Sequence, residues 1–442
     1  MMSKIKPHPS FPDTKITDKV SDLVDSGCWF CILPWTMVYA HDHGKYAPCN
    51  FAVPDDTMSI ENTSIEDWMQ SEKMNQLRSE MLDPHSDHNL INQVCSKCKF
   101  DEHRYGTSRR TNTVSRASYD DKYWKNIKQS VDLYKASGLY DFDNRLIELQ
   151  LRIFGSQCNL DCYMCHHFSS TTRQKQAYEK GVWNDTIWRD IGRSKKLSME
   201  ANLNKVDDND IIDQIVELAP YTRTLKIIGG EPLVMKQYYT LLDKLISCGE
   251  SKNIMIKYQT NLTKLNNGKH NFLNYIPHFK EVTVVVSIDG IGIYNDYIRR
   301  RSKFSEIETN IEKVLQFDNV CVDINGTLSV PGVLRYHEVL EYFEKHPKLN
   351  SINWWMIKDP KQLRINNLPW PLKQKIIPYY EKYPAAIDIV NALKLPPEND
   401  ANFNEVCNYL LLTDESYRGT KWEMHLFDVF PELEEFYERD TK

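Results

Sequence analysis

The sequence predicts an α/β fold: a partial (β/α)6 TIM-like barrel, a small cysteine-rich N-terminal domain and a mostly α-helical C-terminal extension. From about residue 146, apolar strand-like runs alternate with longer amphipathic stretches, which is the pattern of parallel strands joined by crossover helices. Six such strands are too few to fill an eight-stranded barrel. Four cysteines precede this region at ligand-like spacings. We therefore expect domains at residues 1–120, 140–360 and 361–442.

The first of these domains contains Cys31, Cys49, Cys95 and Cys98. Their four thiolates are enough to close a 4Fe-4S cluster with no open site. A four-cysteine zinc ribbon is a rival, because thiolates at such spacings also satisfy tetrahedral zinc. Cys28 forms a C-x2-C pair with Cys31 and is an additional candidate ligand. In a reducing compartment, clustered cysteines are better explained as metal or cluster ligands than as disulfides.

The first five candidate strands of the barrel each show alternating side chains. In the first strand Ile147, Leu149 and Leu151 share one face, which can pack against helices. The next four strands repeat this alternation, with apolar side chains on the same face. The six candidate strands are residues 146–154, 224–230, 254–261, 282–289, 321–330 and 352–357.

The opposite face of the same strands is polar, as Glu148, Lys226, Lys257 and Asn325 illustrate. A closed barrel with a packed core would need apolar layers there, so the pattern predicts a wide or open barrel that holds polar ligands. A half-exposed antiparallel sheet also alternates, but the amphipathic stretches between the strands favour parallel crossovers. Those stretches are residues 210–218, 237–247, 305–317 and 336–345.

A C-x3-C-x2-C triplet, Cys158, Cys162 and Cys165, follows the first strand of the barrel. Three thiolates can hold three corners of a cubane cluster, which leaves the fourth iron open to a small molecule. A structural zinc site usually has four ligands, and His166 and His167 lie awkwardly close to Cys165. The triplet resembles the signature of the radical S-adenosylmethionine (radical SAM) enzymes. In those enzymes the amino and carboxylate groups of SAM bind the open iron.

Two further segments are similar to motifs of this family. Gly229, Gly230 and Glu231 end the second strand and resemble its GGEP motif, which implies that Glu231 accepts hydrogen bonds from the SAM ammonium group. Glycine there allows close backbone approach and positive φ. Asn261 ends the third strand in a segment that resembles the family's T-N-G-T, although Leu262 replaces the glycine.

The fourth strand and the triplet itself supply the remaining SAM contacts that the resemblance implies. It assigns Ser287 and Asp289 to the ribose and Arg299 to the carboxylate. The family usually has an aromatic residue near adenine immediately before the last cysteine, where this chain has Met164. A methionine can also cover an adenine face.

The N-terminal cysteines also resemble a module of radical SAM proteins called SPASM or twitch. The match comprises Cys31 with Pro34 and Trp35, the Pro48-Cys49 segment and a closing C-x2-C pair. It implies a second, auxiliary 4Fe-4S cluster. The order is unusual, because the module more often follows the barrel.

Composition limits the partners. The chain has 442 residues and a net charge of −6, so no overall basic field indicates a nucleic-acid partner. It has no apolar signal region and no run of 18 apolar residues, so we expect a cytoplasmic protein with no membrane association. The excursion at residues 169–222, with Trp183 and Trp188, is expected to carry helices beside the substrate entrance. The tail at residues 422–437 also has a helical pattern.

The resemblance implies reductive cleavage of SAM to a 5'-deoxyadenosyl radical that abstracts hydrogen from a substrate. That substrate is a peptide or protein, or a small polar metabolite, and the electron donor is a protein such as flavodoxin or ferredoxin. One alternative is a non-catalytic iron–sulfur or zinc module that works through partner contacts. Another is a radical SAM enzyme that modifies nucleotides or RNA, which the acidic balance disfavours.

Overall fold

The computed structural model describes residues 19–25, 27–40, 44–140, 142, 145–165, 169–180, 208–397 and 403–438. His166 and His167 lie outside the described residues. So do Trp183 and Trp188, together with the helices expected around them.

Within the described residues, eight strands form one sheet in the order β10-β9-β8-β5-β4-β3-β1-β2. The six strands from β3 to β10 in this order are all parallel, which rules out the antiparallel alternative. Because β10 and β2 are the two ends of the sheet, the barrel is partial and does not close, as predicted. The six strands are β3 (Ile147–Leu151), β4 (Thr222–Ile227), β5 (Met255–Thr260), β8 (Glu281–Ser287), β9 (Val320–Leu328) and β10 (Leu349–Met356).

Two short strands from the N-terminal region extend this sheet, and the sequence pattern did not predict them. Strand β1 (Met37–Ala40) pairs in parallel with β3, and β2 (Tyr46–Ala47) pairs antiparallel with β1. The N-terminal region is thus joined to the barrel by backbone hydrogen bonds. The predicted domain boundaries themselves stay a prediction.

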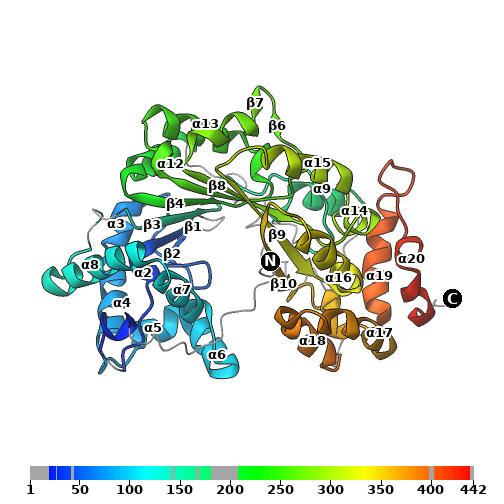
Figure 1. The fold of residues 1–442 in the computed structure, drawn as a ribbon, viewed down its shortest axis with the longest axis horizontal. Coiled ribbons are helices and arrows are strands. Elements are labelled where there is room, and N and C mark those ends of the chain that lie inside the picture. The colour runs from blue at the N-terminus through cyan, green and yellow to red at the C-terminus, as the bar shows by residue number, and fades with distance from the viewer. Residues whose placement is uncertain are drawn as a thin grey trace.

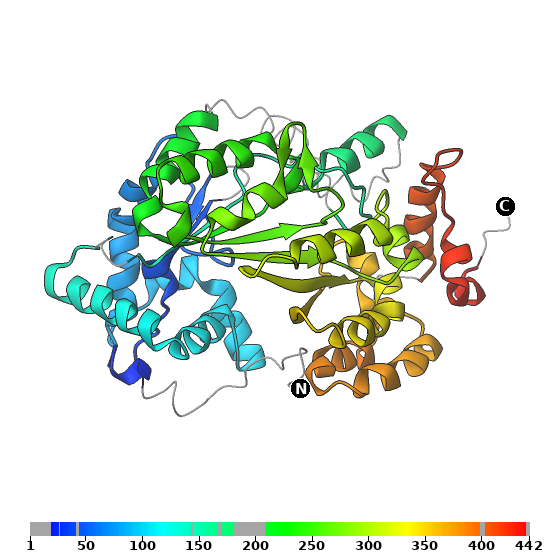
Figure 2. The ribbon, with the colours of Figure 1, turned by 45° about the horizontal axis from the view of Figure 1, so that its top comes forward.

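Helices cover the apolar face of the sheet, running from above it to its right-hand side in Figure 1, and Figure 2 shows them in a turned view. The strand residues on this face, such as Leu149, Ile227, Val284 and Ile324, are fully buried, so the core lies between the sheet and these helices. The covering helices are α12 (Asp208–Glu217), α13 (Lys236–Ser247), α14 (Ile293–Ile298), α15 (Phe304–Val314) and α16 (Val330–Glu344).

The N-terminal helices gather on one side of the molecule (Figure 1). Several begin at side-chain caps that satisfy free backbone N–H groups: Ser64, Ser71, Ser108 and Asp120 each accept a hydrogen bond from the first turn. These helices are α2 (Leu33–Thr36), α3 (Ile65–Met69), α4 (Glu72–Leu82), α5 (Asn89–Val94), α6 (Ser96–Tyr105), α7 (Arg109–Ser118) and α8 (Asp121–Ser137).

The C-terminal helices lie on the opposite side, beyond β10 (Figure 1). They are α17 (Trp370–Glu381), α18 (Ile387–Lys394), α19 (Phe403–Glu415) and α20 (Leu426–Val429). In the tail, the expected helical pattern is realised as α20 and a 3-10 helix at Pro431–Phe436, which are separated by Phe430.

Short elements connect this framework. Helix α9 (Thr171–Lys180) follows the loop after β3, and β6 (Asn266–Asn267) with β7 (His270–Asn271) forms a hairpin. The structure also describes 3-10 helices at Ala219–Tyr221, Pro232–Val234, Ser251–Asn253, Phe272–Asn274, Ile276–His278, Lys361–Leu363, Ile365–Asn367 and Pro384–Ala386. No helix among the described residues has the length and apolar character needed to cross a bilayer.

Candidate functional site

The three-cysteine loop, residues 158–165, lies beyond the carboxyl end of β3, where the neighbouring parallel strands also end. The thiols of Cys162 and Cys165 are hydrogen-bonded to each other. This bond lowers the pKa of Cys165 to about 7 and raises that of Cys162, while burial raises the pKa of Cys158 to about 12. The loop therefore presents three sulfur donors, of which Cys162 is buried and Cys158 and Cys165 are half-buried, and Cys165 has the lowest pKa of the three.

The GGEP segment packs directly on the backbone that leads into this loop. An added Cβ at Gly230 would lie 2.3 Å from the carbonyl oxygen of Gln157 and 2.5 Å from that of Ser156. The amide of Glu231 donates to the same Gln157 oxygen at 2.8 Å. Neither Gly229 nor Gly230 has a positive φ, so glycine is needed here for close approach alone.

The carboxylate of Glu231 ties this segment to the end of the third barrel strand. One oxygen accepts from the hydroxyl of Thr260 at 2.6 Å and from the amide of Leu233 at 3.1 Å, and the other accepts from the amide of Asn261 at 2.6 Å. Burial raises the pKa of Glu231 to about 7, although these hydrogen bonds oppose the rise. Glu231 thus fixes the relative positions of two loops.

Asn261 then connects to the three-cysteine loop. Its amide nitrogen donates to Oδ1 of Asn159 at 3.1 Å, and Asn159 donates to the hydroxyl of Thr263 at 2.8 Å. Leu262 has φ +50, the left-handed conformation that favours glycine. The departure from T-N-G-T therefore keeps the glycine-type backbone, with a leucine side chain that is fully buried.

A buried ion pair follows the fourth barrel strand. Nε of Arg299 lies 2.9 Å from Oδ2 of Asp289, yet neither atom makes an aligned hydrogen bond to a described residue. Oδ1 of Asp289 accepts from the amide of Thr327 at 2.6 Å. Burial raises the pKa of Asp289, and the positive charge of Arg299 opposes that rise. Arg299 also acts electrostatically on Cys162 and Cys165, so it places a cation beside the sulfur donors.

The remaining predicted SAM contacts lie at the same end of the sheet. Ser287 is buried at the end of β8, in register with Asn325 of β9. Met164 is buried in the three-cysteine loop. Its neighbour Tyr163 packs its ring 6.0 Å from that of Tyr297. The donor set, the close glycine approach and the unaligned Asp289–Arg299 pair all fit a cluster with a polar cofactor beside it.

A second sulfur-lined cavity lies in the N-terminal region. It encloses about 330 Å³, including space open to solvent, and Cys31, Cys49, Cys95 and Cys98 all line it. Cys28 does not line it, because its thiol points to the carbonyl oxygen of Leu82 at 3.2 Å. Burial raises the pKa of Cys31 to about 12 and also raises the pKa values of Cys49 and Cys95, so a bound metal would have to displace their protons.

The turn that carries Cys31 is held by a buried arginine. Arg78 on α4 donates two hydrogen bonds to the carbonyl oxygen of Pro34, at 3.1 and 2.9 Å, and one to that of Met69 at 2.7 Å. Its guanidinium lies 4.3 Å from the ring centroid of Tyr140. Arg78 therefore fixes the Pro34-Trp35 segment that follows Cys31.

Another arginine lines the N-terminal cavity itself. Arg110 forms an ion pair with Glu102 at 2.6 Å, donates to the carbonyl oxygen of Phe30 at 2.9 Å and lies over the ring of Trp29. It therefore brings a fixed positive charge to a site lined by four sulfurs.

No three His, Cys, Asp or Glu side chains among the described residues have the spacing of a ready-made single-ion site. The assignment of either cysteine group therefore depends on donor chemistry and on the surrounding cavity or loops.

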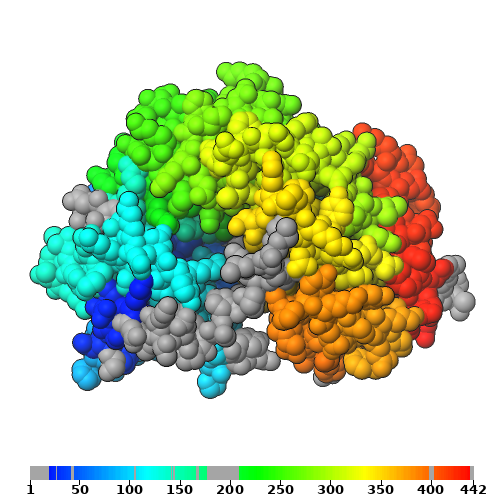
Figure 3. All heavy atoms as spheres, in the orientation of Figure 1, coloured from blue at the N-terminus to red at the C-terminus, as the bar shows by residue number. Residues whose placement is uncertain are grey.

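The inner face of the sheet is polar, as predicted. The strand register places Gln150, Lys226, Lys257 and Thr283 in one row across four strands. Burial lowers the pKa of Lys226 to about 8, and its ammonium forms no ion pair within the described part of the chain. The space-filling view shows the surface hollowed between the N-terminal helices and the region around β10 (Figure 3).

Some residues around the three-cysteine loop were not found from the sequence. Asp161 is inside the triplet and is 0% exposed, and it pairs with Arg173 of α9. Tyr409 and Tyr417, from the C-terminal extension, also reach this loop. In the sequence, the position of Asp161 between two cysteines was the one signal that could have indicated these contacts. No local pattern indicates Tyr409 or Tyr417, because they lie more than 200 positions away.

Comparison with known proteins finds one family model and solved structures that are similar to this chain. The model of the radical SAM superfamily matches residues 153–333, which include the triplet, the GGEP segment and Arg299. No curated protein matches the chain. Among solved structures, the crystal structure of Streptococcus suis SuiB bound to S-adenosylmethionine is similar, with 12% identity and a TM-score of 0.34. The match covers 80% of this chain and 69% of that chain.

Proposed function

We propose, from the match of residues 153–333 to the model of the radical SAM superfamily, that the chain cleaves S-adenosylmethionine reductively at a 4Fe-4S cluster. The cluster is bound by Cys158, Cys162 and Cys165. One electron from an external donor splits SAM into methionine and a 5'-deoxyadenosyl radical, which takes a hydrogen atom from the substrate. The observation that carries this proposal is the three-cysteine loop held against the GGEP segment, with Arg299 beside its sulfurs.

The chain's own residues orient SAM in this proposal. Arg299 binds the carboxylate, since its charge lies next to Cys162 and Cys165. Asp289 and Ser287 contact the ribose. Glu231 receives the ammonium group, because each carboxylate oxygen has two lone pairs and its bonds to the chain use only part of them.

The other side chains of the site shape the pocket around these contacts. Asn261 connects the loop of the third barrel strand to the three-cysteine loop, and Met164 covers the adenine. Gly229 and Gly230 let the GGEP backbone approach closely.

The substrate is polar: a peptide or protein, or a small polar metabolite. The row that includes Lys226 and Lys257 supports this, because an apolar ligand would leave these groups unsatisfied. The proposed electron donor is a protein such as flavodoxin or ferredoxin, and the proposed location is the cytoplasm.

The test is an anaerobic one. The chain is reconstituted with iron and sulfide, reduced with dithionite and incubated with SAM. We expect 5'-deoxyadenosine and methionine to form in equal amounts. A correctly reconstituted protein that yields neither product, and whose spectrum does not change when SAM is added, would favour a non-catalytic metal-binding protein instead.

We also propose that Cys31, Cys49, Cys95 and Cys98 hold an auxiliary 4Fe-4S cluster, which relays electrons or anchors the substrate. Support comes from the position of the four cysteines, which all line one cavity. Four thiolates complete the coordination of a cubane and leave no open iron.

An iron count separates this cluster from a zinc ribbon. The reconstituted wild type is expected to contain roughly eight irons per chain, and Cys49→Ala roughly four, because each cubane has four irons. Cys28→Ala is the matched control and should keep the wild-type count, because Cys28 lies outside the cavity lining. A wild type with about four irons and one zinc would contradict the auxiliary cluster.

A further inference from the structure

Two tyrosine hydroxyls of the C-terminal extension reach the three-cysteine loop. Tyr409 on α19 donates to the carbonyl oxygen of Tyr163 at 2.7 Å. Tyr417, just beyond the end of α19, donates to Oδ2 of Asp161 at 2.7 Å. Both acceptors are fully buried inside the loop. The extension therefore contacts the backbone and a side chain of the segment that carries the sulfurs.

Arg173 on α9 completes these contacts. Its Nη1 pairs with Oδ1 of Asp161 at 3.2 Å, and its Nη2 donates to the hydroxyl of Tyr409 at 2.9 Å. Both oxygens of Asp161 are thus used, one by Arg173 and the other by Tyr417. The hydroxyl of Tyr409 accepts from Arg173 while it donates to Tyr163. A buried carboxylate with two such partners is a well-defined anchor.

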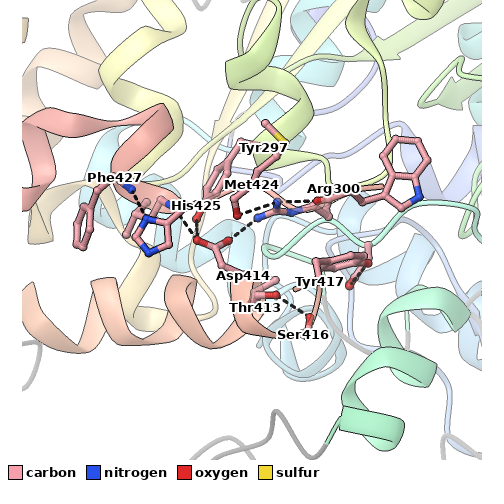
Figure 4. A network of polar contacts seen from close by, with 12 residues as sticks. Tyr297, Arg300, Thr413, Asp414, Ser416, Tyr417, Met424, His425 and Phe427 are labelled. Atoms are coloured by element: carbon pink, nitrogen blue, oxygen red, sulfur yellow. Dashed lines mark hydrogen bonds and ion pairs between the residues drawn. The ribbon is translucent and has the colours of Figure 1, made fainter. Parts of the chain in front are cut away.

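A second connection passes through Arg300. Its carbonyl oxygen accepts from the amide of Asp161 at 3.0 Å. Its guanidinium forms an ion pair with Asp414 near the end of α19, and donates to the carbonyl oxygen of Met424 at 3.3 Å (Figure 4). Asp414 also accepts from the hydroxyl of Tyr297 at 3.2 Å. Arg300 therefore links the two segments: its backbone binds the loop and its side chain binds the C-terminal extension.

The loop has little backbone hydrogen bonding of its own. Between residues 158 and 165, all of which the structure describes, one backbone hydrogen bond is made within the loop, from the amide of Cys165 to the carbonyl oxygen of Cys162 at 3.0 Å. An eight-residue segment with one internal bond depends on outside contacts for its conformation. The C-terminal extension provides a substantial part of those contacts.

We propose that Tyr409 and Tyr417 are positioning residues that hold the three-cysteine loop in the geometry that cluster binding requires. This inference rests on the proposed function, since it assumes a cluster on the triplet. The two tyrosines act through Tyr163 and Asp161. Catalytic constellations must be held to within about 0.5 Å, and a cluster's reduction potential depends on the hydrogen bonds and solvent exposure around its sulfurs.

The double variant Tyr409→Phe/Tyr417→Phe tests this, because it removes both hydroxyl donors and keeps both rings. In the reconstituted holoprotein we expect amide hydrogen exchange in residues 158–165 to be about tenfold faster than in the wild type, because the three hydrogen bonds that the two hydroxyls make are lost. We also expect a shifted midpoint potential for the cluster on the triplet, measured by a redox titration followed by electron paramagnetic resonance.

Tyr437→Phe is the matched control. Its hydroxyl donates to Oδ1 of Asn408 on α19 at 2.8 Å, and its described partners lie within the C-terminal extension. The control should keep the wild-type exchange and potential. If the double variant behaves like the control in both measurements, the positioning role is wrong.

If the double variant does not fold, the single variant Tyr417→Phe decides by the same two measurements, since it retains the Tyr409 bond. The outcome is also separate from that of the proposed function. A wild type that makes no 5'-deoxyadenosine would contradict the function, whereas hydrogen exchange would still report whether the extension holds the loop.

Discussion

Cys162→Ala is expected to reduce the formation of 5'-deoxyadenosine by far more than a hundredfold. Replacing residues that only support metal ligands typically costs 10- to 100-fold, and loss of a ligand itself costs more. The thiol of Cys162 is also hydrogen-bonded to that of Cys165. Its removal therefore leaves two of the three cluster ligands and disturbs one of these two. The measurement is quantification of 5'-deoxyadenosine by chromatography after anaerobic reduction in the presence of SAM.

The iron content of this variant supplies a second readout. Because the N-terminal cavity is separate, Cys162→Ala should retain roughly four irons per chain. Cys248→Ala is the control, since Cys248 is exposed and its thiol points to a carbonyl oxygen of its own helix. Product formation by Cys162→Ala at the level of Cys248→Ala would contradict the assignment of the triplet.

Gly230→Ala is expected to destabilise the chain by about 2 kcal/mol or more, because overpacking against backbone leaves no flexible group to move away. The new Cβ would lie 2.3 Å from the carbonyl oxygen of Gln157, in the segment that leads directly to Cys158. The hydrogen bond from Glu231 to the same oxygen would also be disturbed. We therefore expect a lower unfolding temperature and loss of the iron bound to the triplet.

Gly229→Ala provides the comparison for stability. Its Cβ would meet the terminal methyl group of Met235 at 3.2 Å, and a methionine side chain can move by the few tenths of an ångström required. Its unfolding temperature should therefore fall clearly less than that of Gly230→Ala. Equal unfolding temperatures for the two variants, with iron still bound to Gly230→Ala, would show that the close approach at Gly230 is not needed.

The parts of the fold that were predictable from the sequence are those with local signals. Five of the six barrel strands have a period-two apolar pattern, and the cysteine motifs depend on spacings of two or three residues. Strands β1 and β2 have four and two residues, which is too short for such a pattern. Their pairing with the barrel is set by tertiary packing.

In the candidate site, too, the predictable parts are those with local sequence signals. The triplet, the GGEP segment and Arg299 were found because they match local motifs, and the structure brings them together at one end of the sheet. The contact between Tyr409 and Tyr163 joins residues 246 positions apart, and that between Tyr417 and Asp161 joins residues 256 apart. A single sequence contains no periodicity that pairs such residues. Leu262 was predictable only in part. The sequence shows that leucine replaces the glycine of the motif, but it does not show that the backbone there is left-handed.

The parallel ladder between β1 and β3 has a consequence for how the chain can be divided. A shortened protein that starts at residue 140 would retain every strand of the barrel but would strip the hydrogen-bonding partner from one side of β3, along Glu148 to Leu151. Unpaired strand edges recruit other chains and lead to aggregation. The cysteine-rich segment thus also covers the edge of the barrel's first strand. The barrel is expected to remain free of aggregation only while this segment is attached.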